Sequence, residues 1–174
     1  MRIISGTHKG RKIIPTNNLP VRPTTDKAKE GLFNIISNRY YFSNKNMLDL
    51  FSGTGSIAFE FTSRGGKEAI AIDNNSLCIE FIKNTAKNLN LSIDTIQADA
   101  IKYVSKCNNQ FDFIFADPPY NYKKYEELKT IIIKQKIIKK NGILIIEHDK
   151  DTKFTDKNIE IRKYGTINFS LFSF

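Results

Sequence analysis

From Lys45 onward, short apolar runs alternate with segments of helical periodicity, and this alternation restricts the possible folds more than any other feature of the chain. Short runs rich in Ile, Leu and Phe, joined by helical crossovers, are typical of a parallel sheet that is covered on both faces. The sequence therefore predicts an α/β fold with a doubly wound, mostly parallel sheet. We expect strands at residues 46–51, 68–73, 92–97, 111–116 and 142–147, and helices near 56–64, 76–89, 100–106 and 124–135.

Both ends of the chain depart from this alternation. Residues 1–15 predict a hairpin that turns at "THKG", and the prolines of "NNLPVRP" favour an extended connector. A helix is expected in "TTDKAKEGLFNIISNRY", with candidate caps and an apolar face at Thr24, Thr25, Asp26, Ala28, Leu32, Ile35 and Ile36. Two strand-like runs that flank Lys163–Gly165 predict a closing antiparallel hairpin. We expect a single domain, in which residues 1–44 extend a core formed by residues 45–174.

Acidic residues lie at or just beyond the ends of four predicted strands: Asp49, Asp73, Asp99 and Asp117. In open parallel sheets, ligands bind beyond the carboxyl ends of the strands, where the strand order reverses. Because these ends meet at one edge of the sheet, the four acids predict a ligand site at that edge.

A glycine-rich turn, "DLFSGTGSIAFEF", begins at the first of these acids and opens a helix. Gly53 and Gly55 allow the backbone to turn tightly and approach a ligand, and Ala58 completes the looser form of a dinucleotide-binding pattern. A carboxylate at Asp49 disfavours a pyrophosphate and favours a cation. The ammonium or sulfonium group of S-adenosyl-L-methionine would fit, and a glycine-rich turn without a ligand is the alternative.

The second and third acids each have two interpretations. Asp73 follows Asp49 by 24 positions, a spacing that suits a contact with a ribose hydroxyl pair. It is also a candidate helix cap, although Asn75 can take that role instead. Asp99 can accept a hydrogen bond from an adenine amine or cap the short helix that begins at Ala100. The residues expected at the cofactor are Asp49, Phe51, Ser52, Gly53, Gly55, Asp73, Asn74, Asp99 and Ala100.

The fourth acid stands in "FDFIFADPPYNY", where an apolar strand ends in Asp117, two prolines and Tyr120. Beside a methyl donor, Asp117 and the carbonyl of Pro118 can accept the hydrogens of an exocyclic base amine. The prolines fix φ near about −65° and hold these acceptors in place. Tyr120 can stack on a flipped base, which contributes about 1–3 kcal/mol. We predict that Asp117, Pro118, Pro119 and Tyr120 are catalytic; a rigid turn with a surface tyrosine is the alternative.

The charge balance favours a polyanionic partner, because 27 Lys and Arg residues exceed 18 Asp and Glu residues. A basic cluster before the core contains Arg2, Lys9, Arg11, Lys12, Arg22, Lys27 and Lys29, and Lys123 and Lys124 follow Tyr120. We predict phosphate contacts for Lys9, Arg11, Lys12, Arg22, Lys27, Lys123 and Lys124; a solvated basic face is the alternative. Residues 134–140 are expected to form an exposed helix end and loop.

The sequence gives no support for a metal site, a membrane span or a signal peptide. Cys78 and Cys107 are isolated, and with two lone histidines they form no metal-site pattern. No apolar run approaches the roughly 20 residues of a membrane span, and no signal-peptide core is visible. We expect a cytoplasmic protein without a metal.

The motifs resemble those of a known group of enzymes. Asp117-Pro118-Pro119-Tyr120 resembles motif IV of the amino-methyltransferases, and "DLFSGTGSIAFEFTSRG" resembles their motif I. More narrowly, "MRIISGTHKGRKI", "RPTTDKAKEGLFNII" and "YGTINFSLF" resemble the RsmD family, bacterial enzymes that methylate guanine N2 in 16S ribosomal RNA. Two departures are Ser52, where that family usually has alanine, and Asn74 and Asn75, where further acids are expected.

This resemblance implies a seven-stranded, Rossmann-like class I methyltransferase fold that uses S-adenosyl-L-methionine. It implies that Asp49, Gly53, Gly55 and Asp73 contact the cofactor and that residues 117–120 face the target base. It also implies a monomer whose partner is small-subunit ribosomal RNA or a partly assembled 30S subunit. A DNA adenine-N6 methyltransferase and a catalytically inactive RNA-binding protein of the same fold are the alternatives.

Overall fold

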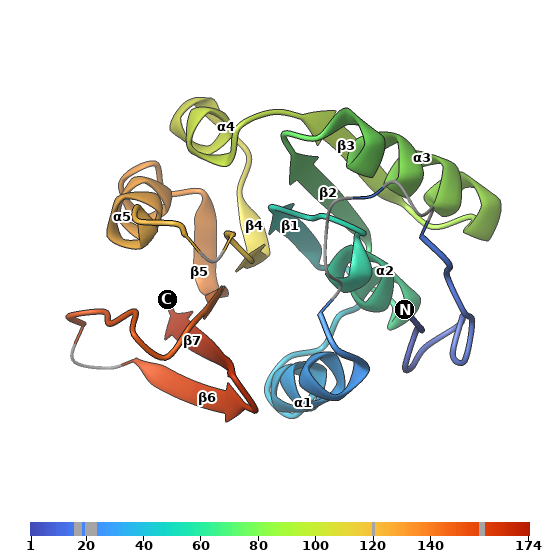
Figure 1. Cartoon of the computed structure of the whole chain (residues 1–174), viewed down its shortest axis with the longest axis horizontal. Helices are drawn as coiled ribbons and strands as arrows, with labels where there is room; N and C mark the ends of the chain where they lie inside the picture. The colour runs from blue at the N-terminus through green and yellow to red at the C-terminus, as the bar shows by residue number, and fades with distance from the viewer. Residues whose placement is uncertain (16–18, 20–23, 120, 157–158) are drawn as a thin grey trace.

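The computed structural model describes residues 1–15, 19, 24–119, 121–156 and 159–174, and within them seven strands form one sheet in the order β3-β2-β1-β4-β5-β7-β6 (Figure 1). The closing hairpin pairs antiparallel with β5 through β7, while the other neighbouring strands are parallel. This arrangement confirms the predicted α/β sheet and its C-terminal hairpin. The strands are β1 Asn46–Leu50, β2 Glu68–Asp73, β3 Ile93–Gln97, β4 Phe111–Ala116, β5 Ile138–His148, β6 Glu160–Tyr164 and β7 Ile167–Ser173.

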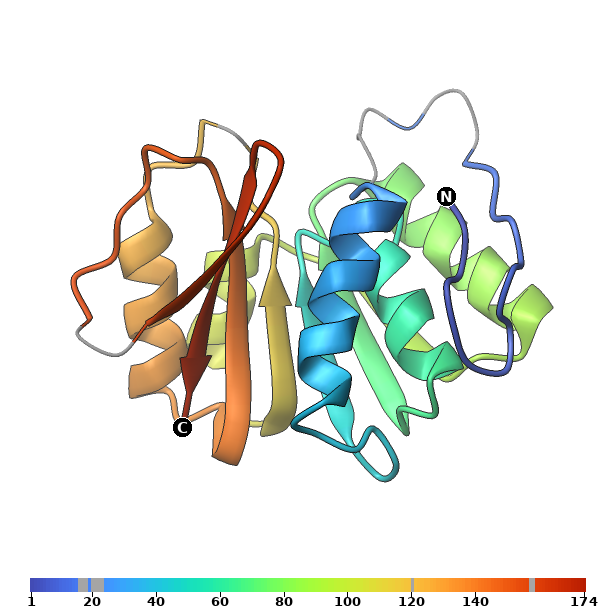
Figure 2. The ribbon, with the colours of Figure 1, turned by 90° about the horizontal axis from the view of Figure 1, so that it is seen from below.

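Helices cover both faces of the sheet, as Figure 2 shows with the strands running vertically in the view. Alternate side chains of a strand point to opposite faces. Met47 and Phe113 therefore belong to the core under the first three helices, whereas Leu48 and Ile114 belong to the core under the last two. The helices are α1 Asp26–Ser37, α2 Ser56–Ser63 and α3 Ser76–Leu89 on one face, and α4 Ala100–Lys106 and α5 Tyr125–Lys134 on the other.

The predicted helix after the N-terminal connector is confirmed as α1. Thr25 is its cap, since its Oγ1 accepts a hydrogen bond from the Ala28 amide at 3.3 Å. Ala28, Leu32 and Ile36 are buried, and Ile35 is half-buried at the edge of the apolar face. The expected connector "NNLPVRP" lies, apart from Leu19, outside the described residues.

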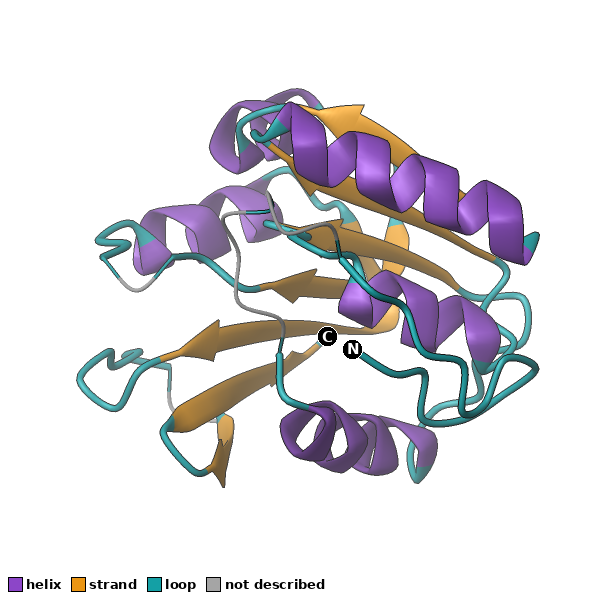
Figure 3. Cartoon of the chain, turned by 45° about the vertical axis from the view of Figure 1, so that its right-hand side comes forward, coloured by secondary structure: helices purple, strands orange, loops and turns teal. Residues whose placement is uncertain are grey.

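The N-terminal hairpin is reduced to a single antiparallel bridge between Arg2 and Lys12, with no regular strand on either side. Its backbone is also tied to α2, and Figure 3 shows the segment running beside that helix. The fully buried carboxylate of Glu60 accepts the amides of Ile4 and Ser5 at 2.7 and 3.1 Å. These bonds add to the hairpin's own pairing, in which the Ile3 amide donates to the Arg11 carbonyl and the Ile13 amide donates to the Met1 carbonyl, both at 3.0 Å. The buried carboxylate requires such donors.

Strand β5 begins earlier than predicted. Ile138 pairs with Phe111, so residues 138–140 belong to the sheet rather than to an exposed loop, and Ile137 is buried. The register then shifts before Phe113, next to Asn141 at a φ of 63°. Such an irregularity interrupts the apolar pattern, which explains why the sequence indicated only the second half of this strand.

Candidate active site

A cavity of about 630 Å³ lies beyond the carboxyl ends of the parallel strands. Its walls come from the ends of β1, β2, β4 and β5, from the start of α2 and from the turn between β6 and β7. This volume falls within the range of small-molecule sites. The predicted site residues that line it are Asp49, Phe51, Ser52, Gly53, Asp73, Asn74, Asp99, Asp117, Pro118 and Pro119.

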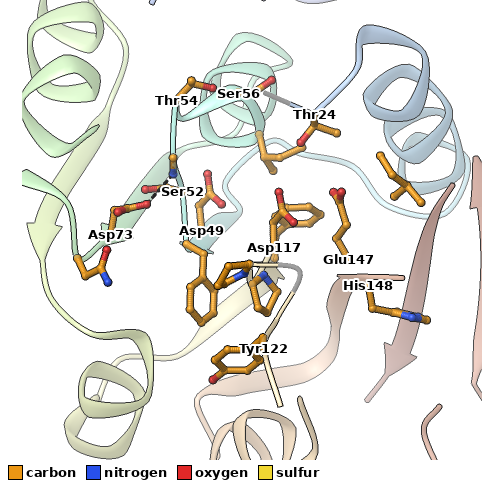
Figure 4. A pocket seen from close by; sticks show the side chains of 18 of the residues that line it. Thr24, Asp49, Ser52, Thr54, Ser56, Asp73, Asp117, Tyr122, Glu147 and His148 are labelled. Carbon is orange, nitrogen blue, oxygen red and sulfur yellow. Dashed lines mark hydrogen bonds between the residues drawn. The ribbon is translucent and has the colours of Figure 1, made fainter. Parts of the chain in front are cut away.

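Three carboxylates enter this cavity from neighbouring strands: Asp49 from β1, Asp117 after β4, and Glu147 from β5 (Figure 4). Each lies two residues beyond a side chain that packs under α1, α2 and α3, so all three belong to the same face of the sheet. The strand order β1-β4-β5 then sets them side by side.

Asp49 and Asp73 hold the glycine-rich turn through hydrogen bonds to backbone amides. The Ala58 amide donates to Asp49 Oδ2 at 3.2 Å, and the Gly53 amide donates to Asp73 Oδ2 at 2.8 Å. Phe51 adopts a φ of 59°, a conformation that disfavours a bulky side chain and is often found at functional sites. Gly55 adopts a φ of 72°, which confirms the tight turn, and a Cβ there would lie 2.8 Å from Ile82 on α3. Its contact with the cofactor stays a prediction.

The sequence left open whether Asp73 caps α3 or faces a ligand, and in the structure Asn75 is the cap. Asn75 caps α3, since its Oδ1 accepts the Leu77 amide at 2.9 Å. Asp73 lines the cavity and accepts the Asn75 amide at 2.9 Å in addition to the amide of Gly53. Its contact with a ribose stays a prediction.

Asp99 caps α4, with its Oδ1 accepting the Lys102 amide at 2.9 Å. The same residue lines the main cavity and, with Ala100, a small adjoining cavity of about 20 Å³. The capping role is therefore observed, and the contact with an adenine stays a prediction.

Burial raises the pKa of three carboxyl groups that line the cavity, those of Asp49, Asp117 and Glu147. Burial raises the pKa of Asp49 to about 8 against the opposing hydrogen bond from the Ala58 amide, and the nearby Asp117 and Asp73 add smaller increases. Burial likewise raises the pKa of Asp117 to about 7. For Glu147, burial and the nearby Asp117 raise the pKa to about 8. A cavity with these properties favours a bound positive charge, because such a charge offsets the cost of ionising buried carboxyl groups.

Sequence reasoning missed several residues of the cavity wall. Glu147 is an acid at the end of a parallel strand, so the rule that selected Asp49 and Asp117 would also have selected it. Aromatic rings form another part of the wall: Phe51 and Tyr122 meet edge to face with centroids 5.3 Å apart, and Tyr122 meets Tyr125 at the same distance. The buried Tyr122 hydroxyl has no hydrogen-bond partner in the part of the chain that the structure describes.

Six of the residues predicted to contact phosphates are described and exposed, and they do not gather at the cavity: Lys9, Arg11, Lys12, Lys27, Lys123 and Lys124. Lys9, Arg11 and Lys12 lie on the N-terminal turn, where the Thr7 amide donates to the Ser63 carbonyl at 2.7 Å. That contact is at the far end of α2 from the cavity, about 12 Å along an eight-residue helix. Lys27 is exposed on α1, and Lys123 and Lys124 are exposed directly before α5. Arg22 and Tyr120 lie outside the described residues.

The prediction that Lys29 belongs to the basic surface cluster is wrong. Its side chain is 1% exposed and donates to the Arg2 carbonyl at 2.6 Å and to Ser56 Oγ at 3.1 Å. The amine also lies 3.9 Å from Glu60, and burial lowers its pKa despite that neighbour. Lys29 is therefore a structural link between α1, α2 and the N-terminal segment.

The described residues form neither a metal-binding group of side chains nor a membrane-spanning helix. In residues 1–15, 19, 24–119, 121–156 and 159–174, no three His, Cys, Asp or Glu side chains are grouped so that they could hold a metal ion. Cys78 and Cys107 are buried and unpaired by disulfides. No helix within the same residues is long and apolar enough to cross a bilayer.

Comparison with known proteins identifies the family. The chain matches the family described as Conserved hypothetical protein 95 over residues 1–173. It is 35% identical over 161 residues to "Putative rRNA methyltransferase YlbH" of Bacillus subtilis, covering 90% of this chain and 86% of that protein. It is 30% identical over 181 residues to "Ribosomal RNA small subunit methyltransferase D" of Haemophilus influenzae, covering 99% and 93%.

A solved structure supports the fold. The "Putative methyltransferase yhhF from Escherichia coli" superposes with a TM-score of 0.86 at 22% identity, covering 99% of this chain and 97% of that one. The resemblance to RsmD is thus confirmed at the level of the family. The chain belongs to the RsmD/YlbH family of methyltransferases, the family described as Conserved hypothetical protein 95.

Proposed function

We propose that this protein transfers a methyl group from S-adenosyl-L-methionine to the exocyclic N2 amine of a guanine in small-subunit ribosomal RNA. The observation that carries the proposal is Asp117, which follows β4, precedes two prolines and faces the same cavity as Asp49. Membership in the RsmD/YlbH family of methyltransferases supports the reaction type. The two relatives compared above are named for ribosomal RNA, which supports the substrate class.

The acids of the cavity fit the methyl donor. S-adenosyl-L-methionine, when bound, supplies a methyl group on a positively charged sulfur. Asp49 would face that molecule's positive charge, since its buried carboxyl group has a pKa raised to about 8 by burial and gains most from a nearby cation. Asp73 would bond the ribose hydroxyls from the end of β2, and Asp99 would lie at the adenine.

Asp117 has two tasks toward the target amine. Before transfer, its carboxylate accepts a hydrogen of the N2 amine, which orients the nitrogen and lets it become pyramidal. After transfer, the nitrogen carries a positive charge and its remaining hydrogens are acidic. Asp117 then takes the proton, and the pKa of about 7 that burial gives this carboxyl group is suited to that exchange near neutral pH.

The RNA contacts that we propose are extended rather than local. Lys123 and Lys124 are exposed just beyond the catalytic turn, and Lys9, Arg11 and Lys12 are exposed at the far end of α2. A polyanion that contacts both groups must run along one side of the protein, as a structured RNA can. Arg22 as a phosphate contact and Tyr120 as a stacking partner for the flipped base complete the proposed RNA site.

The test is transfer of a tritiated methyl group to 16S ribosomal RNA, to 30S particles and to DNA in parallel, followed by nucleoside analysis. The expected product is N2-methylguanosine in one of the two RNA substrates, absent with Asp117→Asn. Label in N6-methyladenine of DNA would replace this proposal with the DNA enzyme. RNA binding without transfer to any substrate would support the inactive binding protein.

A further inference from the structure

Glu147 is the feature of the cavity that the proposed reaction leaves without a task. It stands near the end of β5, whose Ile146 pairs with Ala116, so Glu147 and Asp117 are neighbours on adjoining strands. Its side chain lines the cavity, is 8% exposed and is directed to the same side as Asp117 (Figure 4). Its Oε2 atom is buried and has no hydrogen-bond partner among the described residues.

No donor to this oxygen is found in the part of the chain that the structure describes. The next residue, His148, is bonded elsewhere: its Nε2 lies 2.8 Å from Ser170 Oγ, and its Nδ1 lies 2.6 Å from the Asp149 carbonyl. The nearest partner across the strands, Asp117, is another acid, and it contributes to the raised pKa of Glu147. A buried oxygen without a donor is destabilising. Because the Glu147 side chain lines the cavity, a ligand bound there is a source of the missing donor.

The chemistry of the bases decides which ligand group fits. Guanine carries two adjacent donors on its Watson–Crick edge, the N1–H group and the N2 amine. Adenine and cytosine each place a ring-nitrogen acceptor beside their amine instead. When both are ionised, two neighbouring carboxylates present acceptors only, so they match guanine and oppose the other two bases.

We propose that Glu147 is the specificity-determining residue of the site, accepting the N1–H of the target guanine while Asp117 accepts from its N2 amine. This inference rests on the proposed function and goes beyond it, since it assigns the choice of base to one side chain. The base is read through the edge that becomes free when it leaves its stack. A site that leaves its own polar group unpaired with the wrong base discriminates strongly against that base.

The test uses an RNA in which the methylated guanine is replaced by 2-aminopurine. This base keeps the N2 amine but has a lone pair at N1 where guanine has a hydrogen. The assay is run above pH 8, so that the carboxyl group of Glu147, whose pKa is raised to about 8, is ionised. We expect the wild-type protein to prefer guanine over 2-aminopurine by at least about 100-fold in kcat/KM.

The matched variant is Glu147→Gln, whose amide can donate to the N1 lone pair of 2-aminopurine. We expect the preference for guanine to fall at least about tenfold, and the variant to methylate 2-aminopurine faster than the wild type does. A purely structural role for Glu147 would slow both substrates together. Cofactor affinity, measured by calorimetry, reports whether the variant is folded.

Three results would overturn the inference. An unchanged preference in a folded Glu147→Gln variant would do so, and so would a wild-type protein that methylates 2-aminopurine as fast as guanine, which requires no variant. In both cases transfer to guanine N2 would still stand, so the proposed function would survive. No transfer to guanine N2 by the wild-type protein would reject both.

Discussion

Ionisation of Asp49 should make cofactor affinity depend on pH. The side chain is 1% exposed, and burial, with Asp117 and Asp73 nearby, raises its pKa to about 8. Below this pH the unliganded protein carries a neutral carboxyl group there. A cation binds best to the ionised form, so binding below pH 8 must release the proton. Affinity should therefore rise with pH up to about 8 and level off above it.

The size of the effect follows from the pKa. About half of the Asp49 carboxyl groups are ionised at the pKa and about 1% two pH units below it, so affinity should fall about 50-fold between about pH 8 and pH 6. Asp49→Asn keeps the shape of the side chain, and its oxygen can still accept the Ala58 amide. The slope of log affinity against pH should lose the contribution of Asp49 in this variant. Above pH 8, where the wild-type carboxylate is charged, the variant should bind the cofactor at least about tenfold more weakly.

The measurement is isothermal titration calorimetry of S-adenosylmethionine at several pH values, in pairs of buffers with different ionisation enthalpies, which counts the protons released. Glu147 and Asp117 also titrate in this range and remain in the variant. The difference between the two proteins therefore isolates Asp49. Equal slopes of log affinity against pH in the wild type and Asp49→Asn would show that this carboxyl group does not face the cation. The charged part of the cofactor would then have to bind elsewhere.

Three further predictions concern the other groups of the site. Asp117→Ala should abolish methyl transfer while calorimetry still detects cofactor binding; retained turnover would contradict its assigned role. Asp73→Ala should weaken cofactor binding about 10- to 100-fold, because a hydrogen bond to a charged group contributes about 1.5–3 kcal/mol; unchanged affinity would remove the ribose contact. Replacing Lys9, Arg11 and Lys12 with Gln together should lower RNA affinity and reduce the slope of log K against log salt by up to about 2, as filter binding would measure; an unaltered slope would move the RNA face elsewhere.

The order and type of the core elements were predictable because short-range patterns determine them. Apolar runs bounded by turns gave the parallel strands, and Lys163–Gly165 gave the closing hairpin. Two errors came from long-range contacts. Strand β5 starts at Ile138 because that residue pairs with Phe111, and the pairing of the N-terminal hairpin stops at Ile3, beyond which Glu60 of α2 takes the amides of Ile4 and Ser5. No local pattern in the sequence reports such partners.

The site residues also divide into those that a local sequence pattern predicts and those that depend on contacts between distant segments. The strand-end rule found Asp49, Asp73 and Asp117, whose positions depend only on the strands that precede them. Glu147 satisfied the rule but was overlooked because no motif surrounds it. Lys29 was assigned to the surface because a lysine in a charged stretch is usually exposed; its burial depends on Glu60 in another helix.

The distribution of charge separates the two proposed substrates. The chain has a net charge of +9, yet several buried or half-buried acids, among them Asp49, Asp117 and Glu147, face one cavity. A phosphate group is repelled by that cavity and attracted to the exposed lysines and arginines outside it. A cationic methyl donor has the opposite preference. The part of an RNA that can enter is therefore a neutral base that offers hydrogen-bond donors, and among the four bases guanine offers an adjacent pair on its Watson–Crick edge. The same acids that attract the cation thus also restrict which base can join it.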